Sequence, residues 1–254
     1  MSAHRLYAWK NEGFDDHVES MLTLWGGLFR RTHLACIRRV LALSSEEAEY
    51  LVRKLVILHD VGKLYIEYQK AITGSGTLNR AEYRHEIVSA YYMYNLALST
   101  SMNEEDYCAM TAIALHHEPI LMGQLARMGE PYLTVTDILR RLRKTSIEGK
   151  ILMDKDGIKL VEDLLRKYVG INVQLPVEVT VEEVANAMRD IILTTSIKGS
   201  THYKARIRLK TSALLSLLCV LDSWPAHKAR REDDGGNFIA RRAELAEVAL
   251  VWLS

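Results

Sequence analysis

Histidine and aspartate side chains recur in otherwise apolar, helix-patterned stretches of this sequence. His59 and Asp60 stand side by side in the segment LHDVGK, and Asp222 lies among leucines in TSALLSLLCVLDSWP. Burying such groups costs free energy unless a partner satisfies them, and a divalent cation satisfies imidazole and carboxylate together. The set of such residues is His17, His59, Asp60, His85, His116, His117 and Asp222.

Seven side chains of this kind are too many for one metal ion. Two ions that share a bridging carboxylate would use all of them, and helical bundles commonly build such sites from inward-facing side chains. The adjacent pair His116–His117 favours a metal, because two neighbouring imidazoles repel each other when both are protonated. Ligands without thiolate suit Mg, Mn, Fe, Ni or Co, so we expect about two divalent ions per chain.

The elements that position these residues are predicted to be helices. A Ser-x-x-Glu capping pattern at Ser44 predicts one helix over 44–72 that carries both His59 and Asp60. Asn103 is the expected cap of another helix, which stops before Pro119. The other ligand-bearing helices are expected over 15–31, opening at Asp15 and Asp16, over 80–98, and over 211–225 at the centre of the core.

The predicted fold class is therefore all-α, a helical bundle in a single domain over 1–254. Its motif-bearing core covers about 12–120 and 205–225, and 131–200 is an insertion-like helical segment. Helical patterns lie at 135–144 and 181–195. A short extended hairpin is expected in the 131–205 region, where VQLPVEVTV is the candidate strand.

Composition limits the partners and the compartment. The 254 residues carry a net charge of +1, so overall charge predicts no polyanion partner and any basic surface must be local. The three cysteines stand far apart, which argues against a disulfide scaffold and suits a reducing compartment. No apolar leader and no membrane span are recognisable, so we expect a cytoplasmic protein without a membrane partner.

The motifs carry a resemblance to a known family. The order H…HD…D resembles the signature of the HD superfamily of metal-dependent phosphohydrolases. The additional histidines in RHEIVSA and ALHH, together with HDVGK, resemble the HD nuclease of type I CRISPR interference, in the form encoded apart from its helicase. The likeness runs from the first expected helix to Asp222, and residues 131–200 contribute no motif to it.

The resemblance implies an HD-domain bundle that hydrolyses single-stranded DNA, with RNA left open, in antiviral defence. It implies a separate helicase subunit and an RNA-guided surveillance complex as partners. Asp60 and Lys63 would be catalytic, and Gly62 would let a helix or a metal-bound water approach closely. By the same resemblance one ion is held by His17, His59, Asp60 and Asp222, and the other by His85, His116 and His117 with Asp60 as the bridge.

A weaker signal concerns the nucleic acid. Basic residues alternate with apolar ones in KGSTHYKARIRLK and could form one cationic face against phosphates, although a solvated helix face is the competing interpretation. Tyr65, Tyr68 and Tyr83 could stack on bases, but core packing explains them better. The expected nucleic-acid-binding residues are Lys198, Lys204, Arg206, Arg208 and Lys210.

Three other functions compete with a nuclease. An HD-family cyclic-dinucleotide phosphodiesterase would carry Gly-Tyr-Pro after the double histidine, and the sequence HHEPILMGQL lacks it. A nucleotide phosphohydrolase would leave His85 and the His116–His117 pair unexplained. A non-enzymatic interaction subunit with a degenerate site is disfavoured by the intact ligand set.

Overall fold

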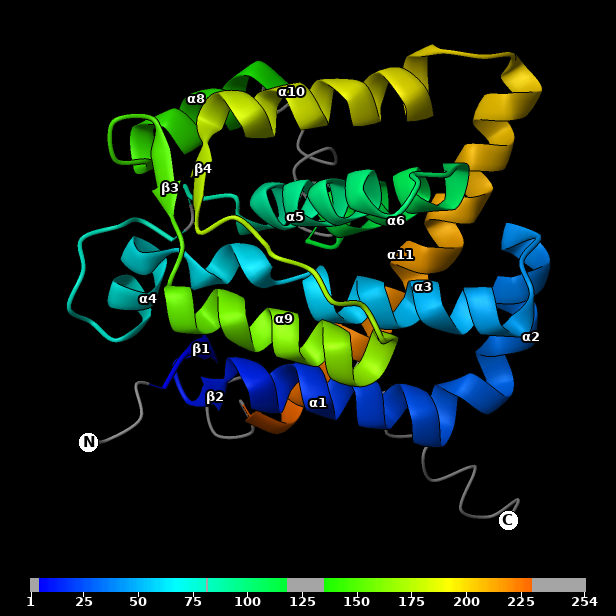
Figure 1. Ribbon diagram of the computed structural model, residues 1–254, viewed down its shortest axis with the longest axis horizontal. Helices are drawn as coiled ribbons and strands as arrows, with labels where there is room; N and C mark the ends of the chain where they lie inside the picture. The colour runs from blue at the N-terminus through cyan, green and yellow to red at the C-terminus, as the bar shows by residue number, and fades with distance from the viewer. Residues whose placement is uncertain (1–4, 81, 118–134, 230–254) are drawn as a thin grey trace, which may run out of the picture.

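Helices make up most of the chain in the computed structural model, which describes residues 5–80, 82–117 and 135–229 (Figure 1). The all-α fold class is confirmed, with two small antiparallel sheets added. The N-terminal half contains β1 (Tyr7–Trp9), β2 (Glu12–Gly13), α1 (Phe14–Leu24), a π-helical turn (Trp25–Phe29), α2 (Arg30–Leu41), α3 (Ser45–Leu58), a 3-10 turn (Val61–Leu64), α4 (Ile66–Ile72), α5 (His85–Ser99) and α6 (Glu104–Leu115).

Two of the predicted helix starts are confirmed in atomic detail. Ser44 caps α3 and Asn103 caps α6, each within a reciprocal capping box. The start predicted for α1 is displaced, because Gly13 is the cap and Asp15 and Asp16 occupy the first turn. Carboxylates in that turn still favour the positive end of the helix dipole.

The single helix predicted over 44–72 is wrong. The α-helix ends at Leu58, His59 is its C-cap, and Asp60 leaves the helical region with φ −115° and ψ 7°. A 3-10 turn follows before α4 begins at Ile66. The apolar spacing of the sequence continues through this break because both pieces are buried, so periodicity alone did not reveal it.

Gly62 lies in that turn, and the expected close approach of a helix is confirmed. A methyl group at Gly62 would overlap the carbonyl oxygen of His85, the first residue of α5, and lie 2.8 Å from its carbonyl carbon. The Gly62 amide also donates to Ser89 Oγ on α5 at 2.8 Å. The absence of a side chain therefore brings the start of α5 onto the turn that follows His59 and Asp60.

The second half contains the extended pair expected in the 131–205 region. Strands β3 and β4 pair antiparallel, with Lys150 opposite Thr180. They do not form a hairpin, because α9 lies between them in the sequence. The helical patterns at 135–144 and 181–195 correspond to α8 and α10. The elements are α8 (Val135–Thr145), β3 (Lys150–Leu152), α9 (Lys155–Val169), β4 (Glu178–Thr180), α10 (Val181–Ile192), a π-helical turn (Leu193–Ile197) and α11 (Thr201–Ala229).

The longest helix, α11, runs through the core as its apolar sequence predicts. Leu214, Leu218 and Leu221 are fully buried. In Figure 1, α11 descends from the end of α10 and passes behind α3 to reach α1, and it packs against α6, α2 and α1. This path brings Asp222 beside residues from the start of the chain. Across the described residues, no helix has the length and apolar content to cross a membrane.

Candidate metal centre

The seven residues singled out by type converge on one place. Their potential ligand atoms form two groups of four, and within each group these atoms lie within 4.8 Å of one another. The groups share Asp60, whose carboxylate is fully buried. The first group is His17, His59, Asp60 and Asp222, and the second is Asp60, His85, His116 and His117.

The first group joins α1, the end of α3 and α11. His17 Nε2 lies 3.2 Å from Asp222 Oδ1 and 3.8 Å from Asp60 Oδ2. His59 Nε2 lies 3.4 Å from Asp60 Oδ2 and 3.8 Å from Asp222 Oδ1. Two imidazole nitrogens and two carboxylate oxygens thus face a common centre, which is a ligand set suited to a divalent cation.

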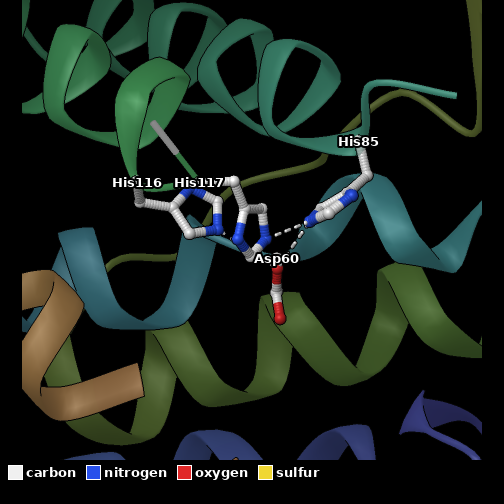
Figure 2. Close-up of side chains that lie close together, drawn as sticks. All are labelled: Asp60, His85, His116 and His117. Atoms are coloured by element: carbon white, nitrogen blue, oxygen red, sulfur yellow. Dashed lines mark hydrogen bonds and ion pairs between the residues drawn. The ribbon is translucent and has the colours of Figure 1, made fainter. Parts of the chain in front are cut away.

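The second group joins the start of α5 and the end of α6 around the other oxygen of Asp60. His85 Nε2 lies 3.2 Å from Asp60 Oδ1, and His116 Nε2 lies 3.6 Å from the same atom. His117 Nε2 is 3.0 Å from His85 Nε2. Figure 2 shows the three imidazole rings converging on the Asp60 carboxylate.

The inward-facing atoms lack hydrogen-bond partners, which tests whether a metal fits. His17 Nε2, His59 Nε2, His116 Nε2 and Asp60 Oδ1 are buried and make no hydrogen bond among the described residues. Four unsatisfied polar atoms in one place would be costly without a ligand. Divalent cations therefore fit both groups.

Backbone carbonyls orient two of the histidines. His59 Nδ1 donates to the carbonyl oxygen of Val56 at 2.7 Å, and His116 Nδ1 donates to that of Ile113 at 2.6 Å. A proton fixed on Nδ1 leaves the Nε2 lone pair for a metal ion. The ends of α3 and α6 therefore select the tautomer as well as the position.

Glu12 orients His17, and sequence reasoning missed it. Its Oε1 accepts a hydrogen bond from His17 Nδ1 at 2.8 Å, and only 8% of Glu12 is exposed. Carboxylates that hold the far nitrogen of a histidine increase its basicity toward a metal. The signal in the sequence is faint, because Glu12 lies on β2, in a hairpin that was not predicted.

Electrostatics keep both carboxylates ionised. Burial alone would raise the pKa of Asp60, but the charges of Lys63 and His59 hold it well below its usual range. Burial is likewise outweighed at Asp222, where the neighbouring imidazoles of His17 and His59 hold the pKa well below its ordinary value. The centre therefore presents two negative charges to a cation.

The histidines differ between the two groups. Burial lowers the pKa of His85, and burial together with the neighbouring His116 and His85 strongly lowers that of His117. These imidazoles are neutral at pH 7, as metal binding requires. In the first group, burial opposes protonation, but Asp60 and Asp222 raise the pKa of His59 to about 10. A metal ion there must displace a proton.

Lys63 lies within the centre. Lys63 is part of the 3-10 turn that follows Asp60, and its Nζ donates a hydrogen bond to Asp60 Oδ2 at a distance of 2.5 Å. The side chain is only 8% exposed, so it does not snorkel to the surface. Lys63 is therefore the cation paired with the shared carboxylate.

The predicted nucleic-acid-binding residues lie away from the centre. Residues 204–210 lie in the first turns of α11, and the helix rises roughly 18 Å from Lys210 to Asp222. Alternate residues of a helix point about 200° apart, so Lys204 and Arg208 lie on one side of α11 and Arg206 and Lys210 on the other. Lys210 is buried in ion pairs with Glu104 and Glu105, and Arg206 pairs with Glu104.

The three tyrosines near the motifs are core residues, as the competing interpretation held. Tyr65, Tyr68 and Tyr83 are at most 3% exposed, and the ring of Tyr83 contacts the other two. Tyr83 Oη also donates to the carbonyl of Gly62 at 3.0 Å. Their rings support the turn beneath the centre instead of offering a stacking surface.

Comparisons with known proteins agree with this geometry. The family described as "Cas3, HD domain" matches residues 16–224. The chain is 29% identical over 234 residues to the CRISPR-associated endonuclease Cas3-HD of Pyrococcus furiosus, covering 90% of this chain and 92% of that protein. It is 33% identical over 177 residues to the Methanocaldococcus jannaschii protein of the same name, covering 65% of this chain and 66% of that one.

One solved structure has the same fold. The CRISPR-associated Cas3 HD domain protein from Methanocaldococcus jannaschii superposes with a TM-score of 0.59 at 24% sequence identity. The match covers 84% of this chain and 98% of that structure. The likeness therefore shows a common fold over most of the chain.

Proposed function

This chain belongs to the Cas3 HD domain family, and we propose that it is a metal-dependent nuclease that cuts single-stranded DNA, with RNA as the alternative, in CRISPR antiviral defence. Its relatives are named CRISPR-associated endonucleases, which supports hydrolysis of phosphodiester bonds as the reaction. A separate helicase and an RNA-guided surveillance complex are its proposed partners.

The observation that carries this proposal is the pair of ligand groups joined at Asp60. The first group, with His17, His59 and Asp222, holds one divalent ion, and the second, with His85, His116 and His117, holds another. Mg, Mn, Fe, Ni and Co are the candidates. Two such ions supply an activated water, neutralise the phosphate and stabilise the leaving oxygen.

The chain's own residues prepare the site for this chemistry. Glu12, Val56 and Ile113 hold three histidines with Nε2 directed inward. Lys63 keeps Asp60 ionised, since its ammonium group donates to Oδ2. An ammonium has three donors, so Lys63 retains capacity for a phosphate oxygen beside the carboxylate.

We propose that the single-stranded nucleic acid reaches the metal centre past the start of α11. Lys198 and Arg208 are exposed there and Lys204 is half-buried, so these three provide the cationic contacts. Arg206 and Lys210 contribute less, because they are already paired with acidic residues of α6. We therefore expect Lys198, Lys204 and Arg208 to contribute more to nucleic-acid binding than Arg206 and Lys210 do.

Cleavage assays test the proposal. Purified protein, stripped of metal and then supplied with Mg²⁺, Mn²⁺, Co²⁺ or Ni²⁺, is incubated with single-stranded DNA, RNA, a cyclic dinucleotide and a deoxynucleoside triphosphate. We expect cleavage of single-stranded DNA that excess chelator stops and that Asp60→Asn abolishes. The control Asp163→Asn changes a half-exposed aspartate on α9 and should cut at the normal rate.

Two results would contradict this function. Cleavage that persists in excess chelator would exclude the metal reaction. Hydrolysis of the cyclic dinucleotide or the triphosphate without cleavage of either polynucleotide would favour the competing HD phosphohydrolases.

A further inference from the structure

Arg80 is a partly buried cation in the connection that leads to His85, and it forms no ion pair among the described residues. Its Nη1 is inaccessible to solvent and has no hydrogen-bond partner among the described residues. The guanidinium carbon lies 5.2 Å from the centre of the Trp9 ring, which holds it by a cation–π contact. A buried guanidinium nitrogen without an acceptor is costly, so an anionic ligand is the natural partner.

The neighbouring carboxylates do not supply that partner. The connection from α4 to α5 carries Glu82, and Glu67 on α4 and Glu86 on α5 flank it; each is already matched with another cation. These pairs are Glu67 with Lys70, Glu82 with Lys144, and Glu86 with Arg84. Arg80 is therefore the arginine that this connection leaves with an unfilled donor.

The fold limits how far Arg80 can lie from the metal centre. Gln69 donates from Nε2 to both the Tyr7 and the Lys63 carbonyl oxygens at 2.8 Å, so it ties strand β1 to the turn that carries Lys63. Trp9, on the same strand, thereby has a fixed position. Arg80 stacks on it from a segment that reaches His85 five residues later, and five residues span at most about 18 Å.

Tyr68 links Arg80 to the ligand residues. Its ring lies 5.8 Å from that of His85, between centroids. Burial raises the pKa of the Tyr68 hydroxyl, and the positive charges of Lys63 and Arg80 both act to lower it. The charges of Lys63 and Arg80 therefore both act on the Tyr68 hydroxyl, and the Tyr68 ring contacts His85 of the second ligand group.

We propose that Arg80, supported by Trp9, binds a phosphate of the nucleic-acid strand that flanks the phosphate being cut. This role rests on the proposed nuclease function and extends it to a substrate subsite. Arginine suits the task because its planar fork donates two parallel hydrogen bonds to a phosphate. The subsite gives the centre a preference for polynucleotides over isolated phosphodiesters.

Two substrates isolate this contact. A single-stranded oligonucleotide has flanking phosphates, whereas bis(p-nitrophenyl) phosphate has one phosphodiester and nothing beyond it. In Arg80→Ala, kcat/KM for the oligonucleotide should fall by about 10- to 100-fold, the worth of a charge-assisted hydrogen bond. Hydrolysis of the small substrate, metal content and melting temperature should all stay at the normal level.

Salt dependence gives a second readout. The plot of log binding constant against log salt for single strands should lose about 0.7 from its slope when one phosphate contact is removed. Arg80→Lys keeps the charge without the fork, so it should keep the slope while weakening binding. Arg166→Ala, an exposed arginine paired with Asp163 on α9, is the matched control and should change neither quantity.

The outcomes separate the two proposals. If normal protein cuts neither substrate with any metal, the nuclease proposal fails. If normal protein cuts the oligonucleotide and Arg80→Ala matches it in rate and salt slope, the nuclease proposal stands and the Arg80 subsite is wrong. An equal loss on both substrates would also overturn the subsite, because Arg80 would then serve the centre itself.

Discussion

His59 and His116 occupy equivalent places at the ends of two different helices. Each is the C-cap of its helix, and each donates from Nδ1 to the carbonyl oxygen three residues earlier. Their rings meet edge to face, with centroids 5.3 Å apart. Carbonyl groups in the last helical turn thus fix the tautomer on both sides of Asp60, one for each ligand group.

Removing one ligand from each group should separate the two ions. Asp222→Asn keeps the shape but offers a neutral amide, a poor ligand, so the first group should lose its ion. His116→Ala should instead empty the second. Metal analysis by mass spectrometry should fall from two ions to about one in each variant under the two-metal scheme.

The two ligand groups should act as one catalytic unit, so nuclease activity should need both of them. Either variant alone should remove most turnover, and the double variant should be little worse, because residues that act together give non-additive losses. If Asp222→Asn kept its rate and both ions, Asp222 would be a core residue with some other partner.

Glu12 should control metal affinity through His17. Glu12→Ala removes the acceptor of His17 Nδ1, and loss of such partners typically costs 10- to 100-fold in metal affinity. Glu12→Gln keeps an acceptor oxygen without the charge. Its metal affinity should lie between that of Glu12→Ala and that of the normal protein. Calorimetric titration with Mn²⁺ measures both.

The control for Glu12 is Glu19→Gln on the outer side of α1, where the carboxylate is half-exposed and pairs with Lys167. It should bind metal normally. Equal affinity in Glu12→Ala and the normal protein would show that the α1 backbone alone orients His17.

Metal binding to the first group should release protons. In the metal-free protein, burial is outweighed by Asp60 and Asp222, and His59 has a pKa of about 10. Its stabilising contribution is complete below its unfolded pKa of about 6.5 and is lost as pH rises through about 10. Stabilisation by metal should run the other way, growing as pH rises, because the ion displaces the proton.

Titration calorimetry at pH 7.5 in two buffers with different ionisation enthalpies counts these protons. Identical heats in both buffers would mean that no proton leaves and that His59 is neutral before the metal arrives. Asp222→Asn provides the comparison, since removing one carboxylate lowers the pKa of His59 and should reduce the count.

Gly62 should tolerate no side chain. In Gly62→Ala the methyl group overlaps the His85 carbonyl, so the start of α5 must move. Overpacking of this kind lowers the free energy of unfolding by about 1–3 kcal/mol or more. The shift of His85 should also weaken metal binding by the second ligand group. Urea unfolding and metal counting measure the two effects.

Gly27→Ala is the matched control, because a methyl group there meets nothing within 4 Å in an exposed π-helical turn. Replacing a helical glycine by alanine should stabilise the protein by about 0.5–1 kcal/mol. If both variants had normal stability and metal content, the packing of α5 on the turn would not position His85.

The sequence revealed the ligand residues but little of their arrangement. Residue type identified them because ionisable groups in apolar surroundings need partners, and local capping chemistry located Ser44 and Asn103 correctly. The break after Leu58 was invisible to periodicity, since the 3-10 turn and α4 are as buried as the helix before them. Glu12 and Arg80 depend on long-range contacts of a short hairpin, and no local pattern encodes those.

The alternating basic segment illustrates the opposite error. Residues 204–210 alternate like a strand, yet they lie in a helix whose Ile207 is buried and whose Lys210 pairs with acidic residues of α6. Tertiary packing favours the helical period here, and the alternation of basic and apolar residues alone did not reveal it.

The first ligand group joins His17, close to one end of the chain, to Asp222 on the last described helix. During synthesis, a ribosome must therefore translate as far as Asp222 before the first ion can find its full set of ligands. Earlier nascent chains hold at most the second group, whose last member is His117. A protein proposed to cut nucleic acid therefore cannot assemble both metal sites until the ribosome has translated Asp222.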